Sequence, residues 1–174
     1  MFNVGDKIVY PGQGVGIISC IEEREFKGEK QNFYEIDIVN STMKLKLPAS
    51  RFENANIRLV SDSEEIDNSL KDIFNYTEEV DNLQKSVKRE REENNSKKVK
   101  NGTFDDYLSV VCNLTQVKNC GNANSSESQT LNSTRGFVVQ EISEVKGMSI
   151  EEANEFLEKI VERTLTIRGE VQYP

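Results

Sequence analysis

Residues 2–28 read FNVGDKIVYPGQGVGIISCIEEREFKG, in which short β-branched runs alternate with turn residues. The run Asp6–Tyr10 stops at Pro11-Gly12, a pair typical of turns. The next run, Val15–Ile21, is rich in β-branched side chains, which favour strands. Phe26-Lys27-Gly28 then has the composition of a hairpin turn. The stretch predicts two strands that lead into a hairpin.

The next thirty residues extend this β pattern. In Phe33–Val39 apolar and charged residues alternate, which places Tyr34, Ile36 and Ile38 on one face of a strand. Residues 43–47 alternate in the same way, and Ile57–Val60 is a candidate last strand. Four or five short strands within about 60 residues are typical of a small barrel or a strongly bent sheet.

Beyond residue 60 the apolar spacing becomes helical. Ser61–Glu64 has the spacing of a capping box, and Ile66, Leu70 and Ile73 follow at helical intervals. We predict two domains, residues 1–60 and 61–174, and an α+β fold: a β module followed by an all-α domain. The later helices are expected at about residues 80–101, 103–118, 127–146 and 149–163. The pattern gives no functional interpretation for residues 164–174.

Composition excludes several classes of protein. The 174 residues carry 30 acidic and 22 basic side chains, a net charge of −8, and contain neither His nor Trp. Without His there is no Ser-His-Asp catalytic triad and no His-containing zinc site. Three scattered cysteines are too few for a disulfide framework, and no apolar run approaches membrane-spanning length. We expect a cytoplasmic protein with no membrane association.

Two motifs that could carry enzyme chemistry have simpler explanations. Gly12-Gln-Gly-Val-Gly16 precedes a β-branched run, whereas phosphate-binding loops run into a helix. Paired carboxylates such as Asp105-Asp106 and Glu151-Glu152 lie in polar runs or at predicted helix starts, where acidic residues favour the helix dipole. We therefore predict no enzyme activity and no cofactor or metal. The absence of a long apolar heptad repeat predicts a monomer.

One basic segment stands out in this acidic chain. Residues 81–100 carry seven basic and four acidic side chains. The segment favours a solvated helix, because acidic residues interrupt the cations and Glu93 and Lys97 have i,i+4 spacing. Nucleic-acid binding is the alternative, with phosphate contacts from the basic side chains. These are Lys85, Lys88, Arg89, Arg91, Lys97, Lys98 and Lys100.

The chain resembles the CarD family of bacterial transcription regulators, also called CdnL-like. Its first 60 residues are also similar to the RNA-polymerase-interacting domain of transcription-repair coupling factor. The similarity is more diffuse from about residue 100 to residue 163. The stretches that carry the N-terminal resemblance are Phe2–Pro11, Gly14–Ile18, Ile21–Gly28, Phe33-Tyr34, Lys44–Pro48 and Ile57–Val60.

The resemblance implies an adaptor of two parts. A Tudor-like (SH3-like) N-terminal module would dock on the β subunit of RNA polymerase, and Arg24 and Lys46 match basic residues at the family's polymerase contact. The helical domain would contact promoter DNA and modulate the stability of the open complex. Together, the match to the family and the basic side chains of residues 81–100 suggest a set of DNA contacts. These are Lys85, Lys88, Arg89, Arg91, Asn95, Lys97 and Lys98.

The chain also departs from the family at its DNA contacts. The family inserts a Trp into the minor groove, but an ungapped count from Gly102 places Lys88 at that position. Two basic positions of the family fall on Glu93 and Ser128. Three hypotheses therefore stand: a polymerase-binding regulator that contacts DNA, a relative that binds polymerase alone, and an adaptor for a different protein.

Overall fold

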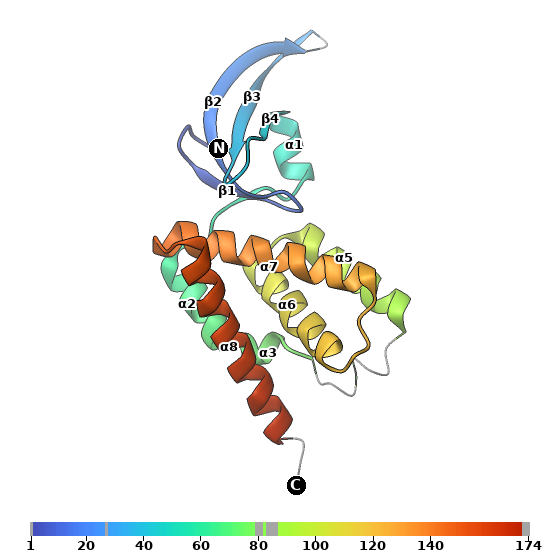
Figure 1. Ribbon diagram of the computed structural model, residues 1–174. Coiled ribbons are helices and arrows are strands. Elements are labelled where there is room, and N and C mark those ends of the chain that lie inside the picture. Colours follow the sequence, from blue (N-terminus) through green and yellow to red (C-terminus); the bar gives the residue numbers. More distant parts are fainter. Residues whose placement is uncertain (1, 27, 79–81, 83–86, 172–174) are drawn as a thin grey trace. The chain divides into compact units, whose positions relative to one another are not determined.

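The computed structural model describes residues 2–26, 28–78, 82 and 87–171 of the chain. The chain divides into two compact units, residues 1–60 and 61–174. The first is an antiparallel β unit and the second is helical, so the fold is α+β as predicted (Figure 1).

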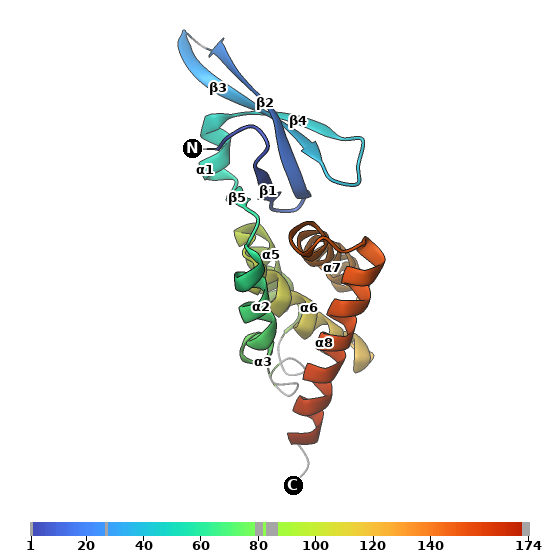
Figure 2. The same ribbon diagram turned by 90° about the vertical axis from the view of Figure 1, so that its left-hand side faces the viewer.

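The β unit is a five-stranded antiparallel sheet in the order β4-β3-β2-β1-β5. The strands are β1 Lys7–Tyr10, β2 Gly14–Phe26, β3 Glu29–Ile38, β4 Lys44–Pro48 and β5 Arg58–Leu59. The long strands β2 and β3 form a curved hairpin, and a bulge between Ile18 and Cys20 interrupts their register (Figure 2). Bulges increase the local twist of a sheet, which accounts for the bend.

Two glycine-containing segments behave as the sequence predicts. The 12–16 motif is a turn that runs directly into β2, with the Gln13 amide donating to the Tyr10 carbonyl at 2.9 Å. Phe26 and Glu29 form the last pair of the β2–β3 ladder, so the hairpin reverses where expected. Lys27, the middle residue of the predicted turn, lies outside the described residues.

The core of the β unit lies on one face of the sheet. It contains Tyr34, Ile36 and Ile38, the alternating set predicted from β3. Helix α1, Ala49–Asn54, adds Phe52, whose ring centroid lies 4.4 Å from that of Tyr34. Helix α1 was not predicted, because a helix of six residues is too short to show a helical period.

The helical unit contains α2 Ser63–Lys71, α3 Ile73–Tyr76, α5 Lys88–Asn101, α6 Phe104–Asn119, α7 Ser125–Lys146 and α8 Ile150–Val171. Helix α6 is the centre of this unit and packs against α2, α3, α5, α7 and α8. Tyr107, Leu108 and Leu114 of α6 are almost completely buried. Helix α8 continues through residues 164–171, beyond its predicted end at about residue 163.

Local capping chemistry sets the helix ends. The first capping box is formed by Asp62 and Glu65, one residue later than the predicted Ser61–Glu64 pair. Asn124 and Glu127 form a second box at the start of α7. Gly102 ends α5 in the left-handed conformation with a φ of 77°, which glycine adopts without steric cost.

Candidate functional site

The exposed face of the β unit brings together the two residues matched to the polymerase contact. Arg24 and Glu22 are two residues apart on β2 and therefore point to the same face. Lys46 reaches that face from β4, where it pairs with Glu35 of β3. Arg24 Nη2 and Lys46 Nζ lie 2.7 Å and 2.8 Å from the same Glu22 oxygen, Oε2. The register of β2, β3 and β4 thus brings Arg24 and Lys46 together, although they are 22 residues apart in the chain.

Glu22 orients Arg24 and Lys46 while both side chains stay partly exposed. The hydrogen bond from Lys46, and then the one from Arg24, hold the pKa of the Glu22 carboxyl below its ordinary value. The Arg24 side chain is 54% exposed and that of Lys46 is 32% exposed. Both cations can therefore meet an acidic partner in a fixed geometry, with Glu22 partly compensating their charge.

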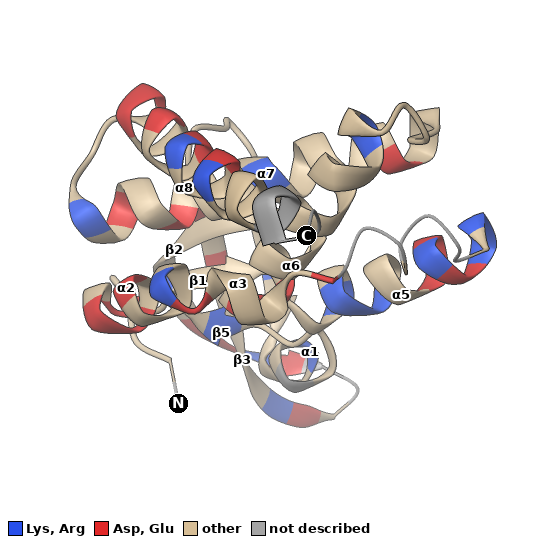
Figure 3. Cartoon of the chain, turned by 90° about the horizontal axis from the view of Figure 1, so that it is seen from below, with Lys and Arg blue, Asp and Glu red and all other residues tan. Residues whose placement is uncertain are grey.

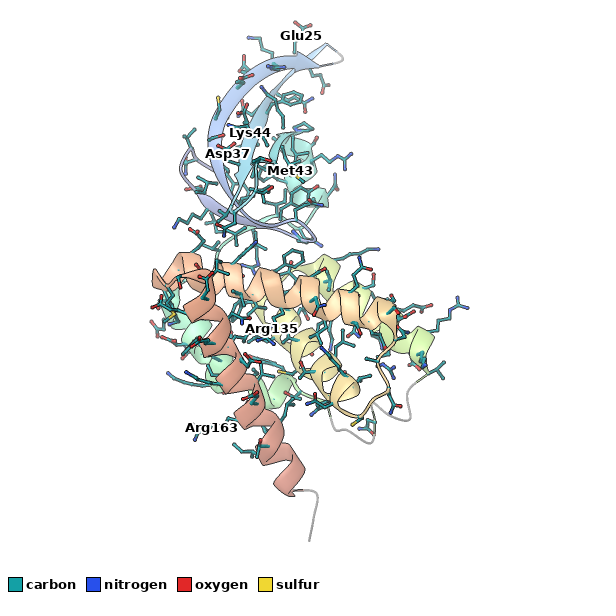
Figure 4. All side chains as sticks on the ribbon, viewed as in Figure 1. Glu25, Asp37, Met43, Lys44, Arg135 and Arg163 are labelled. Atoms are coloured by element: carbon teal, nitrogen blue, oxygen red, sulfur yellow. The ribbon has the colours of Figure 1, made fainter. Side chains whose placement is uncertain are left out.

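Further ion pairs lie along the same face of the sheet. Lys44 of β4 lies 3.1 Å from Asp37 of β3, and Figure 4 shows these two side chains close together on adjacent strands. Lys44 and Lys46 each lie 3.9 Å from a different oxygen of Glu35. The face is therefore a row of alternating charges, opposite to the apolar core.

Helix α5 carries most of the predicted nucleic-acid contacts, and it starts at Lys88 rather than near residue 80. Basic and acidic side chains are interspersed along it (Figure 3). Lys88, Arg89 and Lys97 are exposed. Arg89 also pairs with Glu93, with 3.0 Å between Nε and Oε1. Lys85 lies outside the described residues.

The structure corrects the prediction for Arg91 and Asn95, which face the interior of the helical unit. They are 7% and 5% exposed, so neither presents a surface for phosphate contact. Arg91 Nε lies 2.6 Å from Oε1 of Glu127, a carboxylate that is itself buried. Arg91 anchors α5 to the first turn of α7, because α5 has few apolar side chains with which to pack.

Glu127 remains ionised in this buried position. Burial by itself would raise the pKa of its carboxyl, but the hydrogen bonds from Arg91 and from the Asn124 backbone outweigh burial. The pKa is consequently lowered, with a further electrostatic contribution from Lys88. Asn124 also donates to Glu92 Oε1 at 2.9 Å, which adds a second contact between α5 and α7.

Lys98 is also engaged within the helical unit. Its ammonium group donates to the Ser109 hydroxyl at 2.8 Å and lies 3.6 Å from Glu78 Oε1. Ser109 in turn donates to the Tyr76 carbonyl at 3.0 Å. Lys98 thus connects α5, α6 and the segment after α3. A phosphate contact would have to compete with these internal contacts of the ammonium group.

Glu22 and Glu127 are the residues that sequence reasoning missed. The signal for Glu22 was available, since side chains two residues apart on a strand share a face. No local signal identifies Glu127 as the partner of Arg91, which lies 36 residues earlier in the chain. Among the described residues there is no cluster of three or more Cys, Asp or Glu that could hold a metal ion. Nor is any described helix long and apolar enough to cross a membrane.

Two family models match the chain, in the order of its two units. The CarD-like/TRCF RID domain matches residues 2–61, and the CarD C-terminal domain matches residues 72–158. A relative in Bacillus subtilis (strain 168), "Putative transcription factor YdeB", is 33% identical over 156 residues. That alignment covers 90% of this chain and 99% of the relative. The chain belongs to the CarD-like family.

Family membership gives the general role of this CarD-like protein. CarD-like proteins are transcription factors and non-enzymatic regulators, which agrees with the prediction of no enzyme activity. The N-terminal match is to a module shared with transcription-repair coupling factor, where RID abbreviates the RNA-polymerase-interacting domain. Both halves of the family architecture are present and in order.

Proposed function

We propose that this CarD-like protein docks on the β subunit of RNA polymerase through the face that carries Arg24 and Lys46. The convergence of these two cations on Glu22, from β2 and β4, is the observation that supports this site. A preset pair of donors suits an acidic surface, because little side-chain entropy remains to be lost on binding. The helical unit would then modulate the stability of the open promoter complex.

Charge reversal tests the docking site. Arg24→Glu should abolish binding to the purified N-terminal lobe of the β subunit. The new carboxylate would join those of Glu22 and Glu35, which already lie beside Lys46 on that face. Lys30→Glu is the matched control, since Lys30 is also an exposed cation on the β2–β3 hairpin. Lys30 pairs with Glu23, which points to the opposite face of β2 from Glu22 and Arg24.

Calorimetric titration of the lobe with the full chain gives the readout. Loss of binding in Arg24→Glu but not in Lys30→Glu would support the docking face. Equal behaviour of the two variants would reject it. Wild-type protein that fails to bind the lobe would reject the polymerase function and favour an adaptor for a different protein.

A second candidate, polymerase binding without DNA contact, is supported by α5. Arg91 and Lys98 are committed to internal partners, and Arg89 pairs with Glu93. Lys88, Lys97 and Lys100 remain on the exposed part of the helix. Lys100 has a further interaction within the protein, so Lys88 and Lys97 are the strongest candidates for phosphate contacts in the described part of α5.

The salt dependence of binding to a promoter fork separates the two candidates. Each phosphate contact contributes about 0.9 to the slope of log K against log salt concentration on duplex DNA. Lys88→Ala and Lys97→Ala should each reduce the slope by about that amount if α5 contacts DNA. Lys159→Ala, an exposed lysine on α8, serves as the control. A wild-type slope near zero would favour the regulator that binds polymerase alone.

A further inference from the structure

Two consecutive backbone amides at the junction of the units bond to different units. The Val60 amide donates to the Lys7 carbonyl at 3.1 Å and so continues the pairing of β5 with β1. The next amide, that of Ser61, donates at 2.8 Å to Oε1 of Glu141 on α7. The division between the two units falls at the same point of the chain. The sheet therefore holds one residue, and a helix of the other unit holds the next.

Glu141 is a fixed acceptor because its side chain lies inside the helical unit. Glu141 is completely buried, and so is its neighbour on α7, Ile142. A buried carboxylate is costly unless hydrogen bonds or opposite charges compensate it, and the Ser61 amide supplies one such bond. Hydrogen bonds to an ionised acceptor are also stronger than those between neutral groups. Glu141 can therefore hold the Ser61 amide as firmly as the core holds Glu141.

Two further contacts attach the chain just after Ser61 to the helical unit. The Asp62 amide donates to Oε2 of Glu65 at 3.0 Å, as part of the capping box of α2. Lys146 Nζ, near the end of α7, lies 2.6 Å from Oδ1 of Asp67 on α2. The chain is thus tied to the helical unit at its first residue and again through the first turns of α2.

These bonds leave two rotatable main-chain angles at the junction. Peptide groups are planar, so the group that contains the Val60 amide moves with the sheet. The group that contains the Ser61 amide moves with the helical unit. Only φ and ψ of Val60 lie between these two groups. The Cβ of valine restricts both angles, whereas glycine would allow a wider range.

We propose that Glu141 is a positioning residue that confines main-chain rotation between the two units to φ and ψ of Val60. Without the bond to Glu141, the torsion angles of Ser61 would be added to the hinge. This role goes beyond docking on polymerase and does not depend on it. A short, restricted connection limits the positions that one unit samples once the other is bound, which raises its effective concentration at its own target.

Amide hydrogen exchange of the full ¹⁵N-labelled chain tests the bond from Ser61. Glu141→Met removes the acceptor but keeps a side chain of similar size, so exchange at Ser61 should become about tenfold faster or more. Glu141→Gln retains an acceptor oxygen and should restore most of the protection. Glu155→Met, at an exposed glutamate of α8, is the matched control and should leave Ser61 unchanged. Wild-type exchange in Glu141→Met, or equally fast exchange in Glu141→Gln, would overturn the proposal.

The ¹⁵N relaxation rates of the two units measure the hinge itself. In Glu141→Met both units should tumble more independently, which lowers the apparent rotational correlation time of each. Val60→Gly should have the same effect, because glycine widens the range of the two hinge angles. Val60→Ile, which keeps the β-branched side chain, is its control and should behave as the wild type does. Wild-type correlation times in both Glu141→Met and Val60→Gly would overturn the proposal.

The outcome is separable from folding and from the docking face. Far-ultraviolet circular dichroism of the same samples shows whether Glu141→Met folds. If it does not, Val60→Gly decides the proposal, because Val60 lies outside the helical unit. Both variants should bind the polymerase lobe as the wild type does, since the docking face belongs to the β unit. Arg24→Glu should in turn leave exchange at Ser61 unchanged.

Discussion

The two units each contain an Arg–Glu pair of similar geometry and opposite exposure. In the β unit, Arg24 Nη2 lies 2.7 Å from Glu22 Oε2, with side chains 54% and 38% exposed. In the helical unit, Arg91 Nε lies 2.6 Å from Glu127 Oε1, with side chains 7% and 1% exposed. The same chemistry therefore serves to present a cation in one unit and to hold a helix in the other.

The reason lies in what each element has available for packing. The sheet buries apolar side chains on one face and leaves its charged face free. Helix α5 contributes Arg91 and Asn95 to the interior, so a charged group substitutes for an apolar contact. A basic residue in the sequence is thus not by itself a candidate for a binding surface.

The largest expected effect is the loss of the buried pair. Glu127→Gln should lower the free energy of unfolding of the helical unit by about 3–5 kcal/mol, because Arg91 would remain buried without a counter-charge. Urea unfolding followed by circular dichroism at 222 nm measures it. Glu93→Gln, which breaks the exposed pair with Arg89, should cost less than about 1 kcal/mol. Similar losses in the two variants would remove the distinction between buried and exposed pairs.

A packing change in the β unit should have the next largest effect. A Cβ added to Gly16 would lie 2.5 Å from Cγ2 of Ile36, so Gly16→Val must displace a core side chain. We expect the free energy of unfolding to fall by about 1–3 kcal/mol, which calorimetry would detect as a lower Tm. Gly136→Ala is the control, since a Cβ there meets no atom within 4 Å. That substitution should stabilise α7 slightly, because alanine favours helix. An unchanged Tm for Gly16→Val would contradict the close packing of β2 on β3.

Acid should affect the helical unit through Glu127. Because its folded pKa lies below the ordinary value of 4.5, the ionised pair contributes fully above that value. Stability should then fall as the pH drops from 4.5 through the folded pKa. Unfolding curves between pH 7 and pH 3 measure this loss, and Glu127→Gln should show a shallower decline. Parallel pH profiles for the variant and the wild type would show that another group controls the acid response.

The smallest effect is expected at the exposed pair. Glu22→Gln should leave the free energy of unfolding almost unchanged, because Arg24 and Lys46 are both solvated without it. Its effect should instead appear in binding, since the two cations lose the carboxylate that orients them. Calorimetric titration of the polymerase β lobe measures the binding change. A large loss of stability in this variant would mean that the two pairs have the same structural role.

Local sequence patterns predicted much of the fold. Alternation in residues 33–39 placed Tyr34, Ile36 and Ile38 in the core, and they are buried there. Gly102 ends α5 as its position after a polar run predicts. Helix α1 was missed, and the first capping box was misplaced by one residue. Helix α1 is too short to establish a period, and Ser61–Glu64 and Asp62–Glu65 both have the spacing of a capping box.

The candidate sites were less predictable. Arg24 and Lys46 were assigned from family resemblance, and only the β2–β3–β4 register shows that they share Glu22. Arg91 and Lys98 belong to the same basic segment, residues 81–100, as Lys88 and Lys97. Their different surroundings depend on contacts with residues on other helices.

The sequence by itself determined the α+β class, the change from β to helical pattern near residue 60 and the family resemblance. Each of these depends on the order and spacing of neighbouring residues. Tertiary structure alone decided which cations are exposed and that Glu127 neutralises Arg91. The physical reason is that burial and pairing are set by residues that are distant in the chain and close in space.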